Sequence, residues 1–469
     1  MKKMRIQFIY PESGYNKYNN LTLINGRYYH GIGQLSAFLK QNGHDTGLIH
    51  IVNEIDIEKV ESDIRKYDPD IICLSSTTHM LSEIILINDL LEKEFSDKTT
   101  IIGGIAISIE PELIDRLKGF DYAVIGDGEI ALIEIIENLK RSSDKKISDI
   151  SNVIKRGQKK ERINVRCHKE FDELPFGDRD IFDFENTDDY KLFKRLPMMT
   201  SRGCRFSCSF CSNSVLRKYY FKDTYLRFRS PKDVCDEIAY CIQKYPEIRS
   251  IQFQSDLFFD NKEWLDDFVK EYKRIALPYH CLMRVEQVDK DVVKLLKESG
   301  CEQVLMGIES GSESTRKSIG KTPKTKIIFK AFELLKRNGI KTGSFNMMGF
   351  LKETTEDIFK GIYLNAILKP DLIQVSIYYP YKNTLLYDQV KDMLYNKHYH
   401  TYFERSLMKE KYLVKNFYYF YKNYEYLMRF INEKKDSRLF WLWELLIKNS
   451  LVSEKILRRN KPETFRILF

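Results

Sequence analysis

Three cysteines lie within eight consecutive positions, and their thiols could ligate a metal, form a disulfide or pack in a core. The stretch SRGCRFSCSFCSN contains Cys204, Cys208 and Cys211. A structural zinc site needs four ligands, commonly two separated pairs, and no second pair lies nearby in the sequence. A disulfide would use two of the three and requires an oxidising compartment. Soft thiolates suit iron, and a short loop can hold three corners of a cubane 4Fe-4S cluster, leaving the fourth iron open to a ligand.

The composition is that of a multidomain globular enzyme. A length of 469 residues predicts two or three domains, and 43% hydrophobic with 30% charged residues allows a large core. Nine cysteines, an odd number, do not suggest a secreted disulfide framework, and no run approaches the ~20 apolar residues of a membrane span. We therefore expect a cytoplasmic protein. A net charge of +9 over 76 basic and 67 acidic side chains gives no argument for a nucleic-acid partner.

The first 140 residues alternate apolar runs with amphipathic stretches, the pattern of a parallel α/β sheet. We expect five strands with helices between them, and so a doubly wound, Rossmann-like domain over residues 1–140 that binds ligands at the carboxyl ends of its strands. The expected strands cover 4–11, 46–52, 70–76, 99–107 and 121–128, and the ends of the last three hold Ser75, Ser76, Gly103, Gly104, Gly126 and Gly128. Glycines there either make tight turns or let the backbone approach a bulky ligand closely.

The rest of the chain divides into a linker, a second α/β region and a helical end. Residues 141–196 are rich in charge and are expected to form a linker. A second alternation over residues 197–397 predicts six βα units, an open partial barrel whose chemistry belongs at the carboxyl ends of its strands. The cysteines follow its first strand. Residues 398–469 are aromatic and basic and predict helices, which either cap the open barrel or contact a membrane surface or a partner.

The cysteine stretch resembles the signature of the radical S-adenosylmethionine (SAM) enzymes. Three residues separate Cys204 from Cys208 and two separate Cys208 from Cys211, with the aromatic Phe210 directly before the third cysteine. The resemblance implies that these cysteines hold a 4Fe-4S cluster whose open iron chelates the amino and carboxylate groups of SAM. One electron, from a low-potential donor of the flavodoxin or ferredoxin type, then cleaves SAM and releases a 5′-deoxyadenosyl radical that abstracts hydrogen from the substrate.

The same resemblance implies a set of SAM contacts. Asp256 ends the second barrel strand where the family often has Gly-Gly-Glu facing the amino group of SAM. Arg284 on the third strand suits the methionine carboxylate, since guanidinium matches carboxylate geometry; an ordinary surface ion pair is the alternative. Glu309 and Ser310 end the fourth strand and would lie near the ribose or the amino group. With Phe210, these residues form the predicted SAM site.

Two later turns depart from the family pattern. MMGFLKET resembles the family's Gly-Phe-Pro-Gly-Glu-Thr, with Leu351 and Lys352 in place of Pro-Gly. YPYKNTLLY likewise resembles a Pro-Tyr-Pro-Gly-Thr turn, with Lys382 and Asn383 in place of Pro-Gly. These replacements bear on the shape of the two loops.

A doubly wound domain directly before such a barrel resembles the cobalamin-binding subclass of the family. GGIAISIEPE and FDYAVIGDGE are typical of that subclass, so the resemblance covers roughly residues 1 to 400. It implies that cobalamin binds at Ser75, Ser76, Gly103, Gly104, Gly126, Gly128 and Glu129. The stretch YYHGIG offers His30 as a cobalt ligand, but Tyr28 stands where such motifs have Asp, and a turn histidine is the default interpretation.

The sequence therefore predicts a cobalamin-dependent radical SAM enzyme. Its most favoured reaction is methylation of an unactivated carbon of a small-molecule or lipid substrate, with one SAM methylating the cobalt and a second supplying the radical. Relatives in the same subclass instead perform cyclisation, ring contraction or another oxidative rearrangement. An alternative of another class is a non-catalytic iron–sulfur sensor or electron-transfer protein. No catalytic residue beyond the cofactor ligands is predicted.

Overall fold

The computed structural model describes residues 3–12, 25–141, 147–222 and 224–393. Internal contacts divide these residues into two compact units. The first unit holds residues up to 207 together with 211–279 and 381–384. The second holds 208–210, 280–380 and, among the described residues, 385–393.

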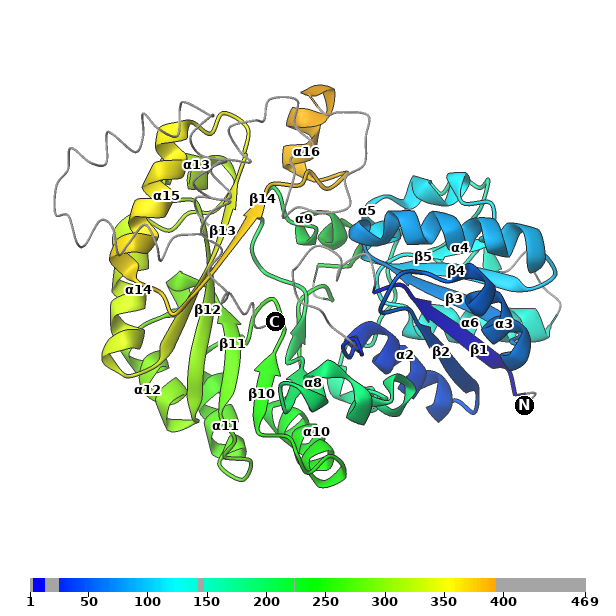
Figure 1. Cartoon of the computed structure of the whole chain (residues 1–469), viewed down its shortest axis with the longest axis horizontal. Helices are drawn as coiled ribbons and strands as arrows, with labels where there is room; N and C mark the ends of the chain where they lie inside the picture. Colours follow the sequence, from blue (N-terminus) through cyan, green and yellow to red (C-terminus); the bar gives the residue numbers. More distant parts are fainter. Residues whose placement is uncertain (1–2, 13–24, 142–146, 223, 394–469) are drawn as a thin grey trace. The chain divides into compact units, whose positions relative to one another are not determined.

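The first sheet confirms the predicted doubly wound domain and adds one strand (Figure 1). Its strands are β1 (Arg5–Tyr10), β2 (Asp45–His50), β3 (Ile71–Ser76), β4 (Thr99–Gly104), β5 (Tyr122–Val124) and β6 (Val153–Lys155), in the order β2-β1-β3-β4-β5-β6. The first five pair in parallel, and β6 runs antiparallel to β5. Because β6 lies in the segment 141–196, the expected linker also extends the sheet.

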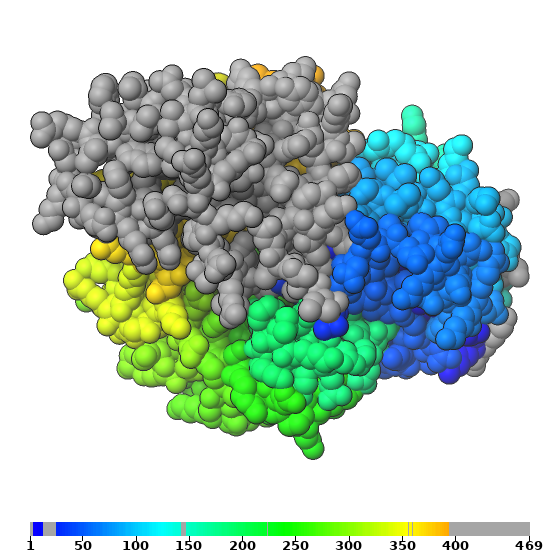
Figure 2. Space-filling model, viewed as in Figure 1, coloured from blue at the N-terminus to red at the C-terminus, as the bar shows by residue number. Residues whose placement is uncertain are grey.

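Helices cover both faces of this sheet. They are α2 (His30–Gln41), α3 (Ile57–Tyr67), α4 (Leu81–Glu94), α5 (Ile105–Ile109) and α6 (Glu129–Lys140). Helix α2 packs beside α6, and α3 beside α4. Residues of this region form the blue to cyan surface in Figure 2. Helix α3 illustrates how the sequence favours these helices. The Asp56 side chain caps its N-terminus by accepting a hydrogen bond from the Lys59 N–H, and Val60 and Ile64 are buried on one face.

The second sheet has the six strands predicted for the partial barrel. They are β7 (Arg195–Met198), β10 (Ser250–Phe253), β11 (Tyr279–Met283), β12 (Cys301–Glu309), β13 (Lys341–Met348) and β14 (Leu372–Ile377), in the order β14-β13-β12-β11-β10-β7. A separate antiparallel pair, β8 (Ser201–Arg202) with β9 (Arg227–Phe228), flanks the cysteine stretch. Sequence patterns missed this pair because a two-residue strand carries no periodicity.

The helices that match the predicted alternation of the second region are α10 (Pro231–Lys244), α11 (Lys262–Tyr272), α12 (Lys290–Glu298), α14 (Thr325–Arg337), α15 (Thr355–Leu368) and α16 (Leu385–Val390). Three short helices were not predicted, namely α8 (Asp188–Lys191), α9 (Asn213–Leu216) and α13 (Glu313–Ser318). Short 3-10 helices are η1 (Thr78–Met80), η2 (Pro111–Arg116), η3 (Phe171–Glu173), η4 (Asp180–Phe182), η5 (Phe184–Asn186), η6 (Arg217–Tyr219), η7 (Val285–Gln287) and η8 (Lys391–Met393).

The loop after β13 is fixed by its own acidic residue. The carboxylate of Glu353 accepts hydrogen bonds from the backbone N–H of Gly349 at 2.6 Å and of Phe350 at 3.3 Å. Thr354 then caps α15 in a capping box with Asp357. Within this loop Lys352 has a φ of 62°, and Asn383 in the loop after β14 also has a φ of 62°.

The left-handed backbone at Lys352 and Asn383 falls where the resembled family has glycine. Each loop therefore adopts a glycine-like conformation without glycine. Asparagine tolerates the left-handed region, whereas in lysine this conformation brings the Cβ too close to the backbone carbonyl oxygen and is destabilising. The Asn383 amide also donates to the Ile109 carbonyl at 2.7 Å. Both turns thus hold a left-handed residue that is not glycine.

The predicted helical region 398–469 lies outside the described residues. Within the described ranges, no helix combines the length and the apolar character that a bilayer crossing requires.

Replacing Lys352 with glycine tests the left-handed turn. We expect Lys352→Gly to raise the free energy of unfolding by up to about 1 kcal/mol, because glycine removes the Cβ clash. Lys352→Ala keeps that clash and should give no gain. Urea denaturation of both variants checks the prediction, and destabilisation by glycine equal to or larger than that by alanine would contradict it.

Candidate active site

A cavity of about 420 Å³ opens at the carboxyl edge of the first sheet, within the first unit. On the sheet side it is lined by the predicted residues His30, Ser75, Gly104, Gly126, Gly128 and Glu129. It is also lined by Arg202 on β8 and by Met199, Arg229 and Gln254, which follow β7, β9 and β10. Four of the six residues predicted from strand ends, Ser75, Gly104, Gly126 and Gly128, thus come together around this cavity.

A smaller cavity of about 60 Å³ continues between the strands and shares Ser75 and Gly104 with the larger one. Gly103 lines this smaller cavity, and a Cβ built on it would meet no atom closer than the Val124 carbonyl oxygen at 3.8 Å. Ser76 differs from its neighbours, because it is fully buried and its hydroxyl donates to the Gly103 carbonyl at 2.7 Å. Ser76 therefore supports the strand ends and lines neither of these two cavities.

Buried ion pairs join the sheet edge to the segment that leads into the cysteines. Arg202 donates to Glu129 Oε1 at 2.8 Å and lies 3.3 Å from Asp127 Oδ1. Arg227 on β9 pairs with the other oxygen of Asp127, and the Tyr220 hydroxyl donates to Asp127 Oδ1 at 3.1 Å. Burial would raise the pKa of Asp127, but the charges of Arg202 and Arg227 outweigh it and lower that pKa. The carboxylate therefore stays ionised inside the protein.

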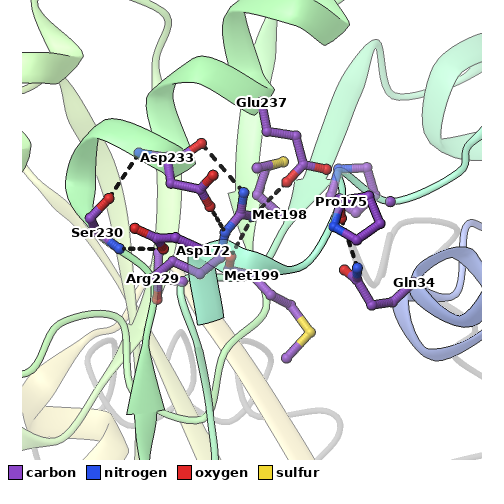
Figure 3. Close-up of polar contacts among 12 residues, drawn as sticks. Gln34, Asp172, Pro175, Met198, Met199, Arg229, Ser230, Asp233 and Glu237 are labelled. Carbon is purple, nitrogen blue, oxygen red and sulfur yellow. Dashed lines mark hydrogen bonds and ion pairs between the residues drawn. The ribbon is translucent and has the colours of Figure 1, made fainter. Parts of the chain in front are cut away.

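Arg229 and Glu237 belong to a second charged group in the lining of the cavity, and Figure 3 shows their polar contacts. Glu237 on α10 pairs with Arg179 at 2.6 Å and with Arg229, and the Arg229 Nε also contacts Asp233 at 2.6 Å. Burial would raise the pKa of Glu237, yet the guanidinium groups of Arg229 and Arg179 lower it to about 2. Nearby, the Gln34 side chain donates to the Pro175 carbonyl at 2.7 Å and ties α2 to this wall.

His30 is the first residue of α2 and not part of a turn. Its ring packs edge-on against Tyr28 with the centroids 5.0 Å apart, and its Nε2 is buried without a hydrogen-bond partner among the described residues. Burial, together with the positive charge of Arg179, lowers the pKa of His30 to about 3. At neutral pH the imidazole is therefore uncharged, the protonation state in which it can bind a metal.

The cysteine stretch is held by donors from several elements. Arg217 donates to the carbonyl oxygens of Cys204 and of Phe206, the latter at 2.9 Å. The Asn213 amide lies 3.5 Å from Cys211 Sγ. In the second unit, the Arg284 guanidinium lies 3.5 Å from Cys208 Sγ. N–H groups directed at sulfur fit a thiolate cluster, whose sulfurs accept hydrogen bonds.

The three thiols are half-buried and none forms a disulfide. In the part of the chain that the structure describes, no three Cys, His, Asp or Glu side chains are grouped closely enough to ligate one metal ion. The assignment of the three cysteines as cluster ligands therefore stays a prediction from their spacing.

The predicted SAM contacts have different surroundings. Asp256 follows β10 and is exposed, with Oδ2 accepting a hydrogen bond from Asn213 at 3.0 Å. Arg284 pairs with Glu286, so an ion pair within the chain already engages its guanidinium. Glu309 has a left-handed φ of 66° and pairs with Lys321 at 2.6 Å.

Ser310 and Phe210 lie in packed surroundings of the second unit. The Ser310 carbonyl accepts a hydrogen bond from the fully buried Arg316 at 2.6 Å. Phe210 packs on Phe350 with the ring centroids 5.8 Å apart. Arg316 thereby fixes the backbone of the turn that follows β12.

Sequence reasoning missed Asp127, Arg227 and Asn213 as residues of the site, and it missed the ion pairs that Arg202 forms with Asp127 and Glu129. Asp127 stands between two of the predicted glycines, and Arg202 stands two residues before Cys204, so adjacency to predicted residues was the available signal. Their pairing was not predictable, because 73 positions separate Arg202 from Glu129 and 100 separate Arg227 from Asp127.

Comparison with known families identifies both halves of this arrangement. Residues 198–360 match the family model of the radical SAM superfamily, and residues 29–136 match that of the B12 binding domain. The chain is a radical SAM enzyme of the cobalamin-binding subclass. The two matches confirm the predicted cofactor set of a 4Fe-4S cluster, SAM and cobalamin for this radical SAM enzyme.

Two curated relatives resemble most of this radical SAM chain. An uncharacterized methyltransferase of Pyrococcus horikoshii is 28% identical over 368 residues, which cover 76% of this chain and 77% of that protein. An anaerobic magnesium-protoporphyrin IX monomethyl ester cyclase of Rubrivivax gelatinosus is 22% identical over 405 residues, covering 83% of this chain and 70% of that protein.

Among solved structures, the radical SAM methyltransferase TsrM from Kitasatospora setae matches with a TM-score of 0.64 and 15% identity. The match covers 83% of this chain and 76% of that one. The cobalamin-dependent radical enzyme OxsB matches with a TM-score of 0.64 and 17% identity over 77% of this chain and 52% of that one. At these identities the likeness shows a shared fold.

The Glu237 ion pairs predict a pH-dependent stability. Because folding lowers the pKa of Glu237 from 4.5 to about 2, its ionised form stabilises the fold above pH 4.5. That contribution, on the order of 3 kcal/mol, is lost as the pH falls towards 2. We expect Glu237→Gln to lower the free energy of unfolding at pH 7 by at least this amount, with the difference from wild type shrinking as the pH falls below 4.5.

Urea denaturation between pH 3 and pH 7 measures that difference. Glu263→Gln is the matched control, because Glu263 is exposed on α11. A Glu237→Gln deficit that does not change with pH would contradict the assignment.

Proposed function

We propose that this enzyme methylates an unactivated carbon of a small-molecule or lipid substrate, using cobalamin and a SAM-derived radical. The observation that carries the proposal is the cavity at the sheet edge. It gathers the residues predicted to bind cobalamin, and one of its walls is Arg202, two residues before Cys204. Resemblance to an uncharacterized methyltransferase supports the methyl-transfer reaction.

The chain's own residues would hold each cofactor in a specific way. Cys204, Cys208 and Cys211 would ligate the cluster, with N–H groups of Arg284 and Asn213 directed at two of their sulfurs. The exposed carboxylate of Asp256 would bind the ammonium group of SAM. When bound, the cluster would supply the electron that cleaves one SAM to a 5′-deoxyadenosyl radical and methionine, and cobalamin would carry the methyl group donated by a second SAM.

Cobalamin fits the larger cavity on chemical grounds. The corrin ring is bulky and carries amide side chains, which need both donors and acceptors at close range. Arg202 and Arg229 supply N–H donors, and Gln254 supplies both kinds of group. Gly104, Gly126 and Gly128 line this cavity with backbone atoms. A Cβ on Gly104 would lie 2.5 Å from the Ser76 carbonyl oxygen, so the packing of the chain itself requires glycine at that position. Ser75, Gly103, Glu129 and His30 complete the proposed cobalamin site, whereas Ser76 supports the strand ends from inside the protein.

His30 is proposed as a cobalamin contact because it lines the cavity and its Nε2 has no partner within the described residues. Ligation of cobalt by this nitrogen can be read directly. Nitrogen hyperfine splitting in the EPR spectrum of the cob(II)alamin-loaded protein would disappear in His30→Ala. Identical spectra of the two proteins would leave His30 as a packing residue beside the ring.

A cyclisation or other oxidative rearrangement is the second candidate reaction. It is favoured by the resemblance to an anaerobic cyclase that covers 83% of this chain. Methylation incorporates a labelled methyl group of SAM into the product, whereas a rearrangement without methyl transfer does not. Either reaction requires a low-potential electron donor, for which we propose a flavodoxin or ferredoxin.

Reconstitution tests the proposed cofactor set. The protein is loaded anaerobically with iron, sulfide and cobalamin, desalted, and examined by absorption spectroscopy. We expect about one equivalent of retained cobalamin, together with cluster absorption that is lost when Cys204, Cys208 and Cys211 are replaced by Ala. A stable cluster without retained cobalamin would contradict the methyltransferase proposal.

Gly103→Val separates cobalamin binding from folding. Its Cβ would sit 3.8 Å from the nearest atom, an ordinary contact, so we expect the variant to fold. The branched side chain would occupy the smaller cavity and weaken cobalamin retention by about tenfold. Gly103→Ala should have a smaller effect, and thermal unfolding checks that both variants keep wild-type stability. Unchanged cobalamin retention in Gly103→Val would place the cofactor elsewhere.

A further inference from the structure

Asn213 connects two residues of the proposed SAM site. It is the first residue of α9, two positions after Cys211, and only 8% of its surface is exposed. Its Nδ2 lies 3.5 Å from Cys211 Sγ and 3.0 Å from Asp256 Oδ2. Its Oδ1 accepts a hydrogen bond from the Tyr225 hydroxyl. One amide group thus contacts a predicted cluster ligand and the predicted partner of the SAM ammonium.

The chemistry of these contacts requires an amide. A side-chain amide offers two N–H donors on one nitrogen and an acceptor on the oxygen. Here the sulfur and the carboxylate take the two donors, and the Tyr225 hydroxyl occupies the acceptor. Tyr225 is 5% exposed, so its ring is held by packing and its hydroxyl fixes which way the amide faces. Serine or aspartate could not satisfy all three partners at once.

We propose that Asn213 is a positioning residue that couples the electronic state of the cluster to the binding of SAM, through Cys211 on one side and Asp256 on the other. The inference rests on the proposed function, since it takes Cys211 as a cluster ligand. An N–H donated to a cluster thiolate stabilises the reduced, more negatively charged cluster and raises its potential. The other N–H holds one oxygen of Asp256, which orients that carboxylate for the ammonium group.

The potential of the cluster and the binding of SAM influence each other because both Cys211 and Asp256 contact the same amide group of Asn213. When the ammonium of SAM pairs with Asp256, the hydrogen bond from Asn213 to that carboxylate weakens. The strength of the hydrogen bond from Asn213 to Cys211 Sγ then changes as well. SAM binding therefore shifts the cluster potential, and reduction of the cluster shifts SAM affinity by the same factor. Tyr225 sets the orientation on which both effects depend.

Asn213→Ala and the near-isosteric Asn213→Leu test the coupling in the cluster-loaded protein. Redox titration followed by EPR should give a more negative midpoint potential for both variants than for wild type. SAM affinity should weaken by about tenfold, as expected for the loss of one hydrogen bond to a charged group. The shift in potential caused by SAM should shrink in both variants. Tyr225→Phe, which retains the amide, should change each quantity in the same direction and by less.

Iron content and circular dichroism identify any variant that fails to fold. Two different replacements of Asn213 are used so that the test remains possible if one of them does not fold. Wild-type potentials and wild-type SAM affinity in both folded Asn213 variants would overturn the proposal. A loss of iron without a change in the potential of the remaining cluster would also overturn it, because that outcome describes a structural role. Failure of the proposed function is distinguishable, because it appears as wild-type protein that retains a cluster and no cobalamin while the Asn213 effect on the potential persists.

Discussion

The paired burial of Asp127 and Glu129 with Arg202 and Arg227 is the constraint on which the arrangement of the site depends. A charge removed from water is costly unless it is matched, and losing one member of a buried pair leaves the other uncompensated. These four side chains come from the turn after β5, the start of α6 and the pair β8–β9. Their pairing therefore fixes the segment that enters the cysteine stretch against the edge of the first sheet.

Once that edge is fixed, the remaining features of the site follow from local chemistry. The same strand ends that supply Asp127 and Glu129 supply the glycines around the cavity, so the space for a bulky cofactor and the anchor of the cysteine stretch share one edge. Glu237, matched by Arg179 and Arg229, closes another wall with balanced charge. Because each acidic group in the lining is paired with a guanidinium group, the charges of the cavity lining compensate one another. Such a lining offers hydrogen-bond donors and acceptors to an uncharged ligand that is rich in amides.

Much of this architecture could be predicted because its signals are local. The strands of both sheets are apolar runs bounded by turn residues, and the spacing of Cys204, Cys208 and Cys211 is a motif of eight positions. Strands β6 and β9 escaped prediction because each is only two or three residues long and, unlike β5, lies outside the predicted apolar runs. The ion pairs were not predicted because they join residues 73 or 100 positions apart. Local sequence patterns do not indicate which residues at such separations come into contact. The left-handed φ of Lys352 is a third feature that was not predicted, because a lysine side chain disfavours this backbone conformation.

The most direct test of the central claim follows both fates of SAM in one reaction. Cofactor-loaded protein is given SAM with a deuterated methyl group and a low-potential reductant, and the products are analysed by mass spectrometry. Cobalamin-dependent radical methyl transfer predicts 5′-deoxyadenosine and, in the same sample, the deuterated methyl group on cobalamin. Formation of 5′-deoxyadenosine with no label on protein-bound cobalamin would contradict methyl transfer, and the absence of both products would contradict the radical SAM chemistry itself.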